Sequence, residues 1–150
     1  MILQTMKSKL LRVLYLRPFA VLGVSCSVPT ASPLYYWGGY QEATYNYYKE
    51  QTPESICGLI VNYEYMIQHP GGTRQVPPPG ICAEYAYLLQ APGTAEIFAE
   101  HATKEQKKLF EGDDYATIFH EKSLEMFKKE IELYPESEKF IKPIFKNASN

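Results

Sequence analysis

The sequence predicts an all-α domain of about five to six helices that follow an N-terminal signal segment. Apolar side chains recur at spacings of three and four residues through most of the chain, as they do on one face of a helix. Clusters of proline and glycine separate these stretches, and the alternating pattern of β-strands is nearly absent. The chain has 150 residues, of which 45% are hydrophobic, which is enough for one domain with a modest core.

The first two helices are predicted on either side of the sequence EQTPES. The first runs from Tyr36 to Glu50, and its inner face comprises Tyr36, Tyr40, Ala43 and Tyr47. Thr52 is suited to cap the second helix, and Pro53 is suited to its first turn. The apolar stripe of the second helix ends before HPGG, which predicts a break there.

Three consecutive prolines make the segment TRQVPPPG a loop, because proline removes backbone donors and disfavours regular structure. The pattern then predicts a third helix over residues 80–90 and a fourth, more polar one over residues 94–110. Asp113 or Asp114 is suited to cap a fifth helix that ends at Tyr134. A short helix over residues 136–146 closes the chain.

The predicted helices group into pairs. Stacking helical hairpins is how tetratricopeptide-type domains bury a core, although the period here is not a clean repeat of about 34 residues. A stretch from about residue 91 to residue 117 separates the third helix from the fifth, with which it would otherwise form an ordinary hairpin. We therefore predict short tetratricopeptide-like helical hairpins with an insertion in the second hairpin.

The first 26 residues differ in composition from the rest of the chain. They hold four basic residues and no acidic ones, and they end in PFAVLGVSC. This composition is typical of a secretory signal, and the cysteine after GVS is similar to that of a bacterial lipoprotein signal. We predict a signal peptide over residues 1–25, lipid attachment at Cys26, a tether over residues 26–34 and a helical domain over residues 35–150.

Alternatives to this interpretation stay open. Gly23 stands where such signals usually have leucine, and translation starts at either Met1 or Met6. An amphipathic N-terminal helix of a cytosolic protein, packed on the core through its leucines, would also account for part of the pattern.

The predicted location is the bacterial cell envelope, where the protein is an outer-membrane lipoprotein that faces the periplasm. Ser27, directly after the cysteine, is compatible with outer-membrane sorting. From residue 26 onward the chain has eleven basic and seventeen acidic residues, a net charge of about −6. This balance disfavours a surface for nucleic acid or for anionic lipid. The predicted partners are therefore the membrane, through the lipid anchor, and a protein of the envelope, with no nucleic acid.

Three segments carry a resemblance to a known family. LYYWGGY, PPPGICAEYAYLLQ and FKKEIELYPESEKFI resemble an uncharacterised family of bacterial lipoproteins, the domain of unknown function 4810, which has a tetratricopeptide-like helical domain. The resemblance runs discontinuously from about Leu34 to Ile141. It implies a lipidated, envelope-facing helical module without established catalytic residues. Members of the family tend to be encoded near curli-transporter-like lipoproteins, which implies an envelope complex.

The reactive side chains form no recognisable catalytic or metal motif. The three histidines lack a His-Glu-x-x-His arrangement, so we predict no metal site, no cofactor and no enzymatic activity. Neighbouring acids on a lysine-rich helix, such as Glu130 and Glu132, are predicted to lie on a solvated face. Glu64 and Glu84 lie inside aromatic runs, and we predict that they accept tyrosine hydroxyls where helices meet.

Two interpretations of the remaining cysteines stay open. The periplasm permits a disulfide between Cys57 and Cys82. Two small side chains buried in apolar helices are at least as compatible with their sequence context.

Two classes of function follow from these patterns. The first is a non-enzymatic interaction module, for which Tyr35, Trp37, Tyr45 and Tyr48 are the predicted partner-binding residues. For Tyr35 and Trp37 we expect packing on the neighbouring hairpin first and contact with the membrane interface second. The alternative is an envelope protein that binds or hydrolyses saccharide or peptidoglycan through the aromatic stretch.

Overall fold

The computed structural model describes residues 31–148, with side chains described as far as Ile144. The predicted signal peptide and the lipid attachment at Cys26 lie outside the described residues. Residues 31–148 contain seven α-helices and no strands, which confirms the prediction of an all-α domain.

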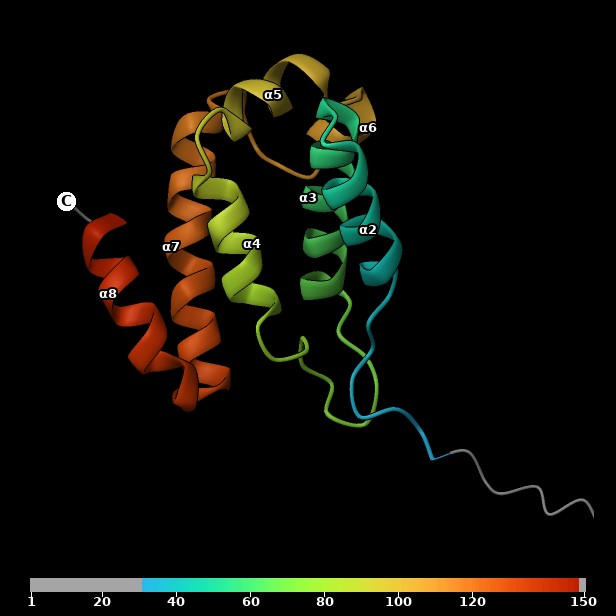
Figure 1. Cartoon of the computed structure of the whole chain (residues 1–150), viewed down its shortest axis with the longest axis vertical. Helices are drawn as coiled ribbons and strands as arrows, with labels where there is room; N and C mark the ends of the chain where they lie inside the picture. Colours follow the sequence, from blue (N-terminus) through green and yellow to red (C-terminus); the bar gives the residue numbers. More distant parts are fainter. Residues whose placement is uncertain (1–30, 149–150) are drawn as a thin grey trace, which may run out of the picture. The chain divides into compact units, whose positions relative to one another are not determined.

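The helices follow one another with short connections, apart from the loop over residues 69–80. In order they are α2 (Tyr40–Glu50), α3 (Pro53–Gln68), α4 (Ile81–Gln90), α5 (Thr94–His101), α6 (Lys104–Lys107), α7 (Tyr115–Leu133), the 3₁₀ turn η2 (Pro135–Ser137) and α8 (Glu138–Ala148). Figure 1 shows α2 beside α3 and α4 beside α7, while α5 and α6 lie at one end of these helices. The chain therefore forms two helical hairpins with an insertion, and α8 packs against α7.

The first helix begins four residues later than the periodicity predicts. Gly38 has a φ of 47°, a backbone conformation that a right-handed helix excludes, so α2 begins only at Tyr40. Tyr36 was predicted to be a core residue, and that prediction is wrong because the side chain is 44% exposed. Tyr40 and Tyr47 do pack against the core.

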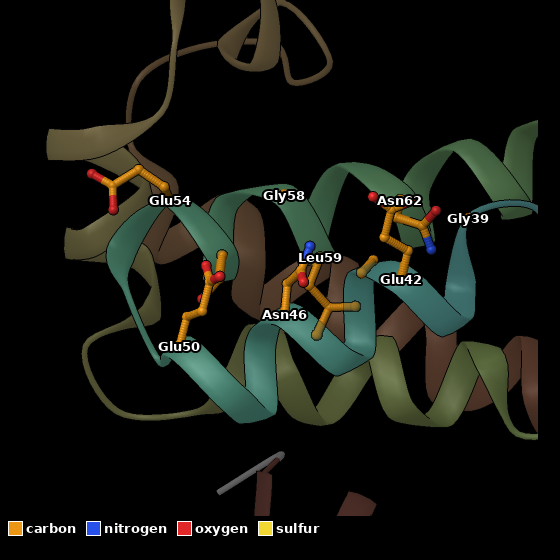
Figure 2. Close-up of a pocket in the computed structure, with 10 residues that line it drawn as sticks. Gly39, Glu42, Asn46, Glu50, Glu54, Gly58, Leu59 and Asn62 are labelled. Atoms are coloured by element: carbon orange, nitrogen blue, oxygen red, sulfur yellow. The ribbon is translucent and has the colours of Figure 1, made fainter.

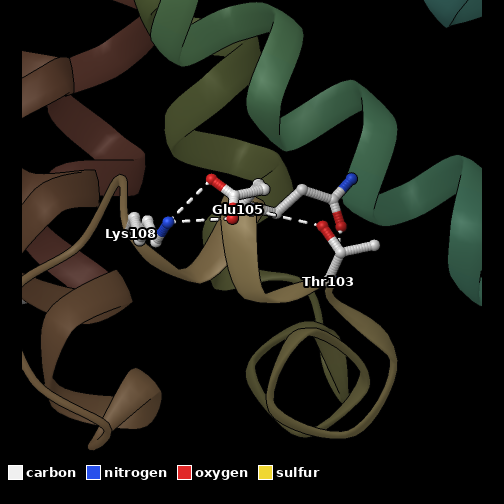
Figure 3. A network of polar contacts seen from close by, with 4 residues as sticks. Thr103, Glu105 and Lys108 are labelled. Atoms are coloured by element: carbon white, nitrogen blue, oxygen red, sulfur yellow. Dashed lines mark hydrogen bonds and ion pairs between the residues drawn. The ribbon is translucent and has the colours of Figure 1, made fainter.

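The predicted fourth helix is divided into α5 and α6. Ala102 adopts an extended conformation, and the backbone then turns into a new helix capped by Thr103. The Thr103 hydroxyl accepts a hydrogen bond from the Gln106 backbone amide at 3.3 Å, and the Gln106 side-chain oxygen accepts one from the Thr103 backbone amide at 2.8 Å. Figure 3 shows this capping box beside an exposed ion pair between Glu105 and Lys108 at 2.8 Å. A reciprocal cap of this kind satisfies two free amides and stabilises a helix start at Thr103, which accounts for the break.

Thr52 and Pro53 begin α3 as predicted. The Thr52 hydroxyl accepts a hydrogen bond from the Ser55 backbone amide at 3.2 Å, and Ser55 Oγ accepts one from the Thr52 backbone amide at 3.0 Å. Only two residues, Gln51 and Thr52, separate α2 from α3. This short connection holds the first hairpin together.

The second hairpin, made by α4 and α7, contains the insertion at the predicted place. Helix α5 packs on both α3 and α7, so the insertion covers the end of the core. Phe98 of α5 is fully buried, and its ring lies 5.3 Å from Phe110, 5.1 Å from Tyr115 and 5.3 Å from Phe119 between centroids. This aromatic cluster fixes the insertion to the first half of α7.

The proline loop is joined to the far end of α7 by two hydrogen bonds. The Gly80 amide donates to Glu130 Oε1 at 2.8 Å, and the Tyr134 hydroxyl donates to the Pro77 carbonyl at 2.6 Å. Glu130 and Tyr134 belong to EIELYPES, while the Gly80 amide and the Pro77 carbonyl belong to PPPG, so two runs of the family resemblance bind each other. We call these two contacts the loop clasp.

Glu130 does not lie on a solvated face as predicted, because its carboxylate caps the N-terminus of α4 and is 1% exposed. The positive end of the helix dipole and its free amides make this a favourable place for an acid. Burial nevertheless raises the pKa of Glu130, although the amides of Gly80, Ala83 and Cys82 act in the opposite direction. Glu132 is exposed, as predicted.

Candidate functional site

Glu84 joins three helices through tyrosine hydroxyls. Glu84 lies in the first turn of α4, and its Oε2 accepts the hydroxyl of Tyr40 from α2 and that of Tyr63 from α3, both at 2.9 Å. The predicted role of Glu84 as an acceptor at a helix contact is therefore confirmed. Because an ionised acceptor strengthens both bonds, this carboxylate sets the spacing of α2, α3 and α4.

A line of aromatic rings runs from the surface into the core through these tyrosines. The ring centroids are 5.4 Å apart between Trp37 and Tyr40, 6.3 Å between Tyr40 and Tyr63, and 5.6 Å between Tyr63 and Tyr85. These separations are typical of favourable aromatic pairs. The line stiffens the wall of the pocket described next.

A pocket of about 300 Å³ opens beside Glu84, and we call it the tyrosine pocket. It is lined by Tyr47, Tyr48, Leu59, Tyr63, Glu84, Tyr87, Leu88 and Ala91. The rim is aromatic and accessible, since Tyr48 is 73% exposed and Tyr87 is 44% exposed. Rings at the rim, aliphatic side chains beneath them and a few polar atoms suit the pocket to an apolar or aromatic group that carries a polar end.

The hydroxyls that face Glu84 remain protonated over the physiological range. Burial, together with the hydrogen bond to Glu84 and its negative charge, raises the pKa of Tyr40 to about 12. Burial is also the main cause that raises the pKa of Tyr63, and the charge of Glu84 adds to it. Both phenols therefore act as donors, and Glu84 is engaged by two hydrogen bonds.

Replacing Glu84 with glutamine is expected to lower the pKa of Tyr40 from about 12 toward 10, because the neutral amide removes the negative charge beside the phenol. Burial keeps the value above that of a free tyrosine. A raised tyrosine pKa stabilises the fold below pH 10, and this contribution is lost as the pH rises through the folded value. The measurement is an NMR titration of tyrosine labelled at Cζ.

The matched control is Glu42→Gln, which removes an acid from α2 that lines a different groove. The Tyr40 titration is expected to stay near pH 12 in this variant. Equal shifts in the two variants would show that the general charge of α2, and not the contact with Glu84, raises the pKa.

A second groove, of about 440 Å³, lies between α2 and α3 and is shown in Figure 2. Its walls carry Glu42, Asn46 and Glu50 from α2, and Glu54 and Asn62 from α3. Its character is acidic and hydrophilic. Among the described residues, no group of three or more histidines, cysteines, aspartates or glutamates is arranged to hold a metal ion.

The four predicted partner-binding residues lie in different places. Tyr48 is on the rim of the tyrosine pocket, and Trp37 packs against Tyr40. Tyr45 is 61% exposed and pairs with Lys49, whose ammonium lies 5.4 Å from the ring centroid. Tyr35 is partly buried. The ring centroids of Tyr35 and Tyr134 are 6.5 Å apart, and the Arg74 guanidinium lies 5.9 Å from the centroid of the Tyr35 ring.

Sequence reasoning missed the partner of Glu64. Glu64 Oε1 pairs with Lys122 Nζ of α7 at 3.2 Å and accepts the Gln68 amide at 2.8 Å, so its main partners are not tyrosines. Among the described residues, neither its Oε2 nor the Tyr85 hydroxyl has a hydrogen bond of good geometry, although the two side chains lie close enough to interact. Burial and the charge of Glu64 raise the pKa of Tyr85 well above its ordinary value. Lys122 follows Glu121 on a charged stretch of sequence, where a surface role would be the ordinary interpretation.

The two described cysteines are free thiols buried in the core. Cys57 lies in α3 and Cys82 in α4, and burial raises the pKa of both thiols. Of the two interpretations of these cysteines, the structure agrees with two small side chains buried in the core and not with a disulfide.

The described residues thus define a small all-α domain in which two helical hairpins form an aromatic pocket that contains one carboxylate in its lining. The chain belongs to the family described as a domain of unknown function (DUF4810), whose model matches residues 34–119. Neither the curated proteins nor the solved structures include a match to the chain. No described helix is both long enough and apolar enough to cross a bilayer.

Proposed function

We propose that the protein is a lipid-anchored, non-enzymatic interaction module of the bacterial cell envelope, and that it holds a partner protein in the tyrosine pocket. The observation that carries the proposal is the rim of that pocket, where Tyr48 and Tyr87 expose large rings on a stiff frame. Exposed tyrosines lose little conformational entropy on binding and dominate many protein interfaces. The partner is a protein and not a nucleic acid, because the chain is acidic from residue 26 onward.

The order of the hairpins supports a tetratricopeptide-like arrangement. The first helices of the two hairpins, α2 and α4, provide Tyr47, Tyr48, Glu84 and Tyr87. Stacked hairpins in repeat proteins form concave surfaces that bind extended partners. The tyrosine pocket is the part of such a surface that two hairpins can build.

The lipid anchor is supported by the composition of the first 26 residues. Four basic residues, an apolar run and small residues before Cys26 combine the parts of a lipoprotein signal. In this proposal the protein is tethered to the outer membrane, faces the periplasm and belongs to an envelope or secretion-associated complex.

Binding of a saccharide or peptidoglycan is the second candidate. The observation in its favour is that Tyr48 and Tyr87 line the same pocket as Glu84, which is an arrangement that can stack on a sugar ring. Hydrolysis is disfavoured because Glu84 accepts two phenols whose raised pKa values keep them protonated. Under this candidate the pocket binds sugars without cleaving them.

Palmitate labelling of the full chain tests the anchor. We expect labelling and membrane fractionation of the wild type, and loss of both in Cys26→Ala, because the thiol is the site of acylation. If Cys26→Ala stayed labelled and in the membrane fraction, the predicted location would be wrong.

Affinity purification of the lipidated chain tests the pocket. The amount of a partner protein that co-purifies with the wild type is expected to fall by about tenfold when Tyr48 and Tyr87 are both replaced with alanine. The reason is that hot-spot tyrosines contribute most of the binding energy of an interface. Tyr45→Ala is the matched control, since Tyr45 is an exposed tyrosine of the same helix outside the pocket. Equal losses in both variants would contradict the proposal, and displacement of the partner by soluble muropeptides would favour the second candidate.

A further inference from the structure

An exposed apolar patch lies at the end of the domain where the described chain begins. It comprises Leu34, Tyr36, Trp37 and Tyr65, each at least 44% exposed, and we call it the tether-end patch. Figure 1 shows the segment before α2 and the loop after α3 at the same end of the domain. Neither the tyrosine pocket nor the acidic groove includes any of these four residues.

The patch is built on a fixed backbone. The amides of Thr73 and Arg74 donate to the carbonyls of Pro33 and Leu34 at 3.0 and 3.1 Å, so the entering segment is bonded to the loop after α3. The Tyr36 side chain packs so closely on Gly71 that a Cβ there would lie 2.9 Å from that of Tyr36. The exposed rings are therefore held in place on the surface.

Tyr36 lies near the C-terminal end of α3, the helix that carries Tyr65. A Cβ at Gly38 would lie 3.4 Å from the Tyr36 ring and 3.6 Å from the Met66 side chain, which places Tyr36 beside the residue that follows Tyr65. The Tyr65 ring also stacks on His69 with 4.5 Å between centroids. Aliphatic, phenolic and indole groups thus share one end of the molecule.

The charge at this end differs from that of the rest of the chain. Residues 31–41 and 65–83, which build it, contain no acidic residue, whereas the chain as a whole has seventeen. The basic side chains that they add are Arg74 and His69. The acidic residues next to these segments include Glu42 on α2, Glu136 after α7, Glu84, which binds the Tyr40 hydroxyl, and the buried Glu130, which binds the Gly80 amide. The lack of acidic residues within residues 31–41 and 65–83 limits the repulsion from lipid phosphates.

The length of the connection to Cys26 also points to the membrane. Seven residues lie between Cys26 and Leu34, and at full extension this connection reaches at most about 30 Å. If Cys26 carries the lipid, the patch is the described surface nearest to the bilayer along the chain. Tryptophan and tyrosine are the side chains that favour the interface between lipid headgroups and water.

We propose that the tether-end patch inserts into the headgroup layer of the membrane, so that the lipid and the patch together orient the domain with the patch against the bilayer. This inference rests on the lipid attachment proposed above. Two weak contacts, one acyl group and one set of interfacial rings, bind a membrane more firmly than either does alone.

Trp37 allows a direct test, because it is the only tryptophan of the chain. The full lipidated protein is reconstituted into phosphatidylcholine vesicles whose acyl chains carry bromine either near the headgroup or near the chain end. We expect shallow bromines to quench Trp37 fluorescence about twofold and deep bromines to quench it little, as for an interfacial indole. Replacing Leu34 and Tyr65 with serine is expected to reduce the quenching, and both are exposed side chains whose loss leaves the core intact.

The matched control moves the fluorophore to the end of the domain opposite the tether-end patch. Leu109 follows α6 and is partly exposed, and α6 lies at the end opposite the patch in Figure 1. Trp37→Phe combined with Leu109→Trp is expected to show no quenching. Flotation of the vesicles separates the two proposals: protein that fails to float contradicts the lipid anchor, whereas protein that floats with Trp37 unquenched overturns insertion of the patch.

Discussion

Replacing Phe98 with alanine is expected to lower the free energy of unfolding by about 4 kcal/mol, measured by urea denaturation followed by circular dichroism. Phe98 is fully buried, and its ring contacts those of Phe110, Tyr115 and Phe119 at 5.1 to 5.3 Å between centroids. Alanine removes this burial and leaves a cavity that the surrounding rings fill only in part. A loss of this size is a large part of the stability of a domain of this length.

Phe140→Ala is the matched control, because Phe140 is 67% exposed. We expect a change within about 0.5 kcal/mol for this variant. If the two phenylalanine variants lost similar stability, Phe98 would not be the residue that holds the insertion to the core.

The second large effect is expected at Lys122. Lys122→Met leaves the buried carboxylate of Glu64 with the Gln68 amide as its remaining partner, and we expect a loss of about 3 kcal/mol. The partial exposure of Lys122 lets water reach the site and keeps the loss near the low end of the range for buried pairs. Chemical denaturation at neutral pH gives the value.

Two further variants make this a test of the ion pair itself. Glu64→Gln combined with Lys122→Met removes both charges and is expected to recover most of the loss, because no buried charge is left unpaired. Lys108→Met breaks the exposed pair with Glu105 seen in Figure 3 and is expected to cost less than about 1 kcal/mol. A double variant as unstable as Lys122→Met would show that the lysine acts through its aliphatic packing.

Periodicity and turn chemistry predicted most of the helices. Thr52 and Pro53 begin α3 as expected, and the predicted insertion lies between the paired helices α4 and α7. The start of α2 was missed because the tyrosine spacing continues backward across Gly38, whose positive φ has no effect on a hydrophobic pattern. Local capping at Thr103 likewise divided a helix that looked continuous.

The candidate site was predictable only where one residue type implied its partner. A carboxylate inside AEYAY suggested a tyrosine acceptor, and Glu84 has that role with two tyrosines. Glu130 was misjudged because its donor, the Gly80 amide, lies fifty residues away in the sequence. The pocket around Tyr48 and Tyr87 could not be derived, since it exists only once α2, α3 and α4 are packed together.

The loop clasp has a mechanical consequence for a protein held by its N-terminal end. A pull on that end reaches the loop after α3 through the bonds from Thr73 and Arg74, and the Tyr134 hydroxyl passes it from Pro77 to α7. The entering segment is thus connected to the loop after α3 of the first hairpin and, through Tyr134, to the second hairpin. If the chain is anchored at Cys26 as proposed, the same bonds connect the anchored end to the two hairpins that form the tyrosine pocket.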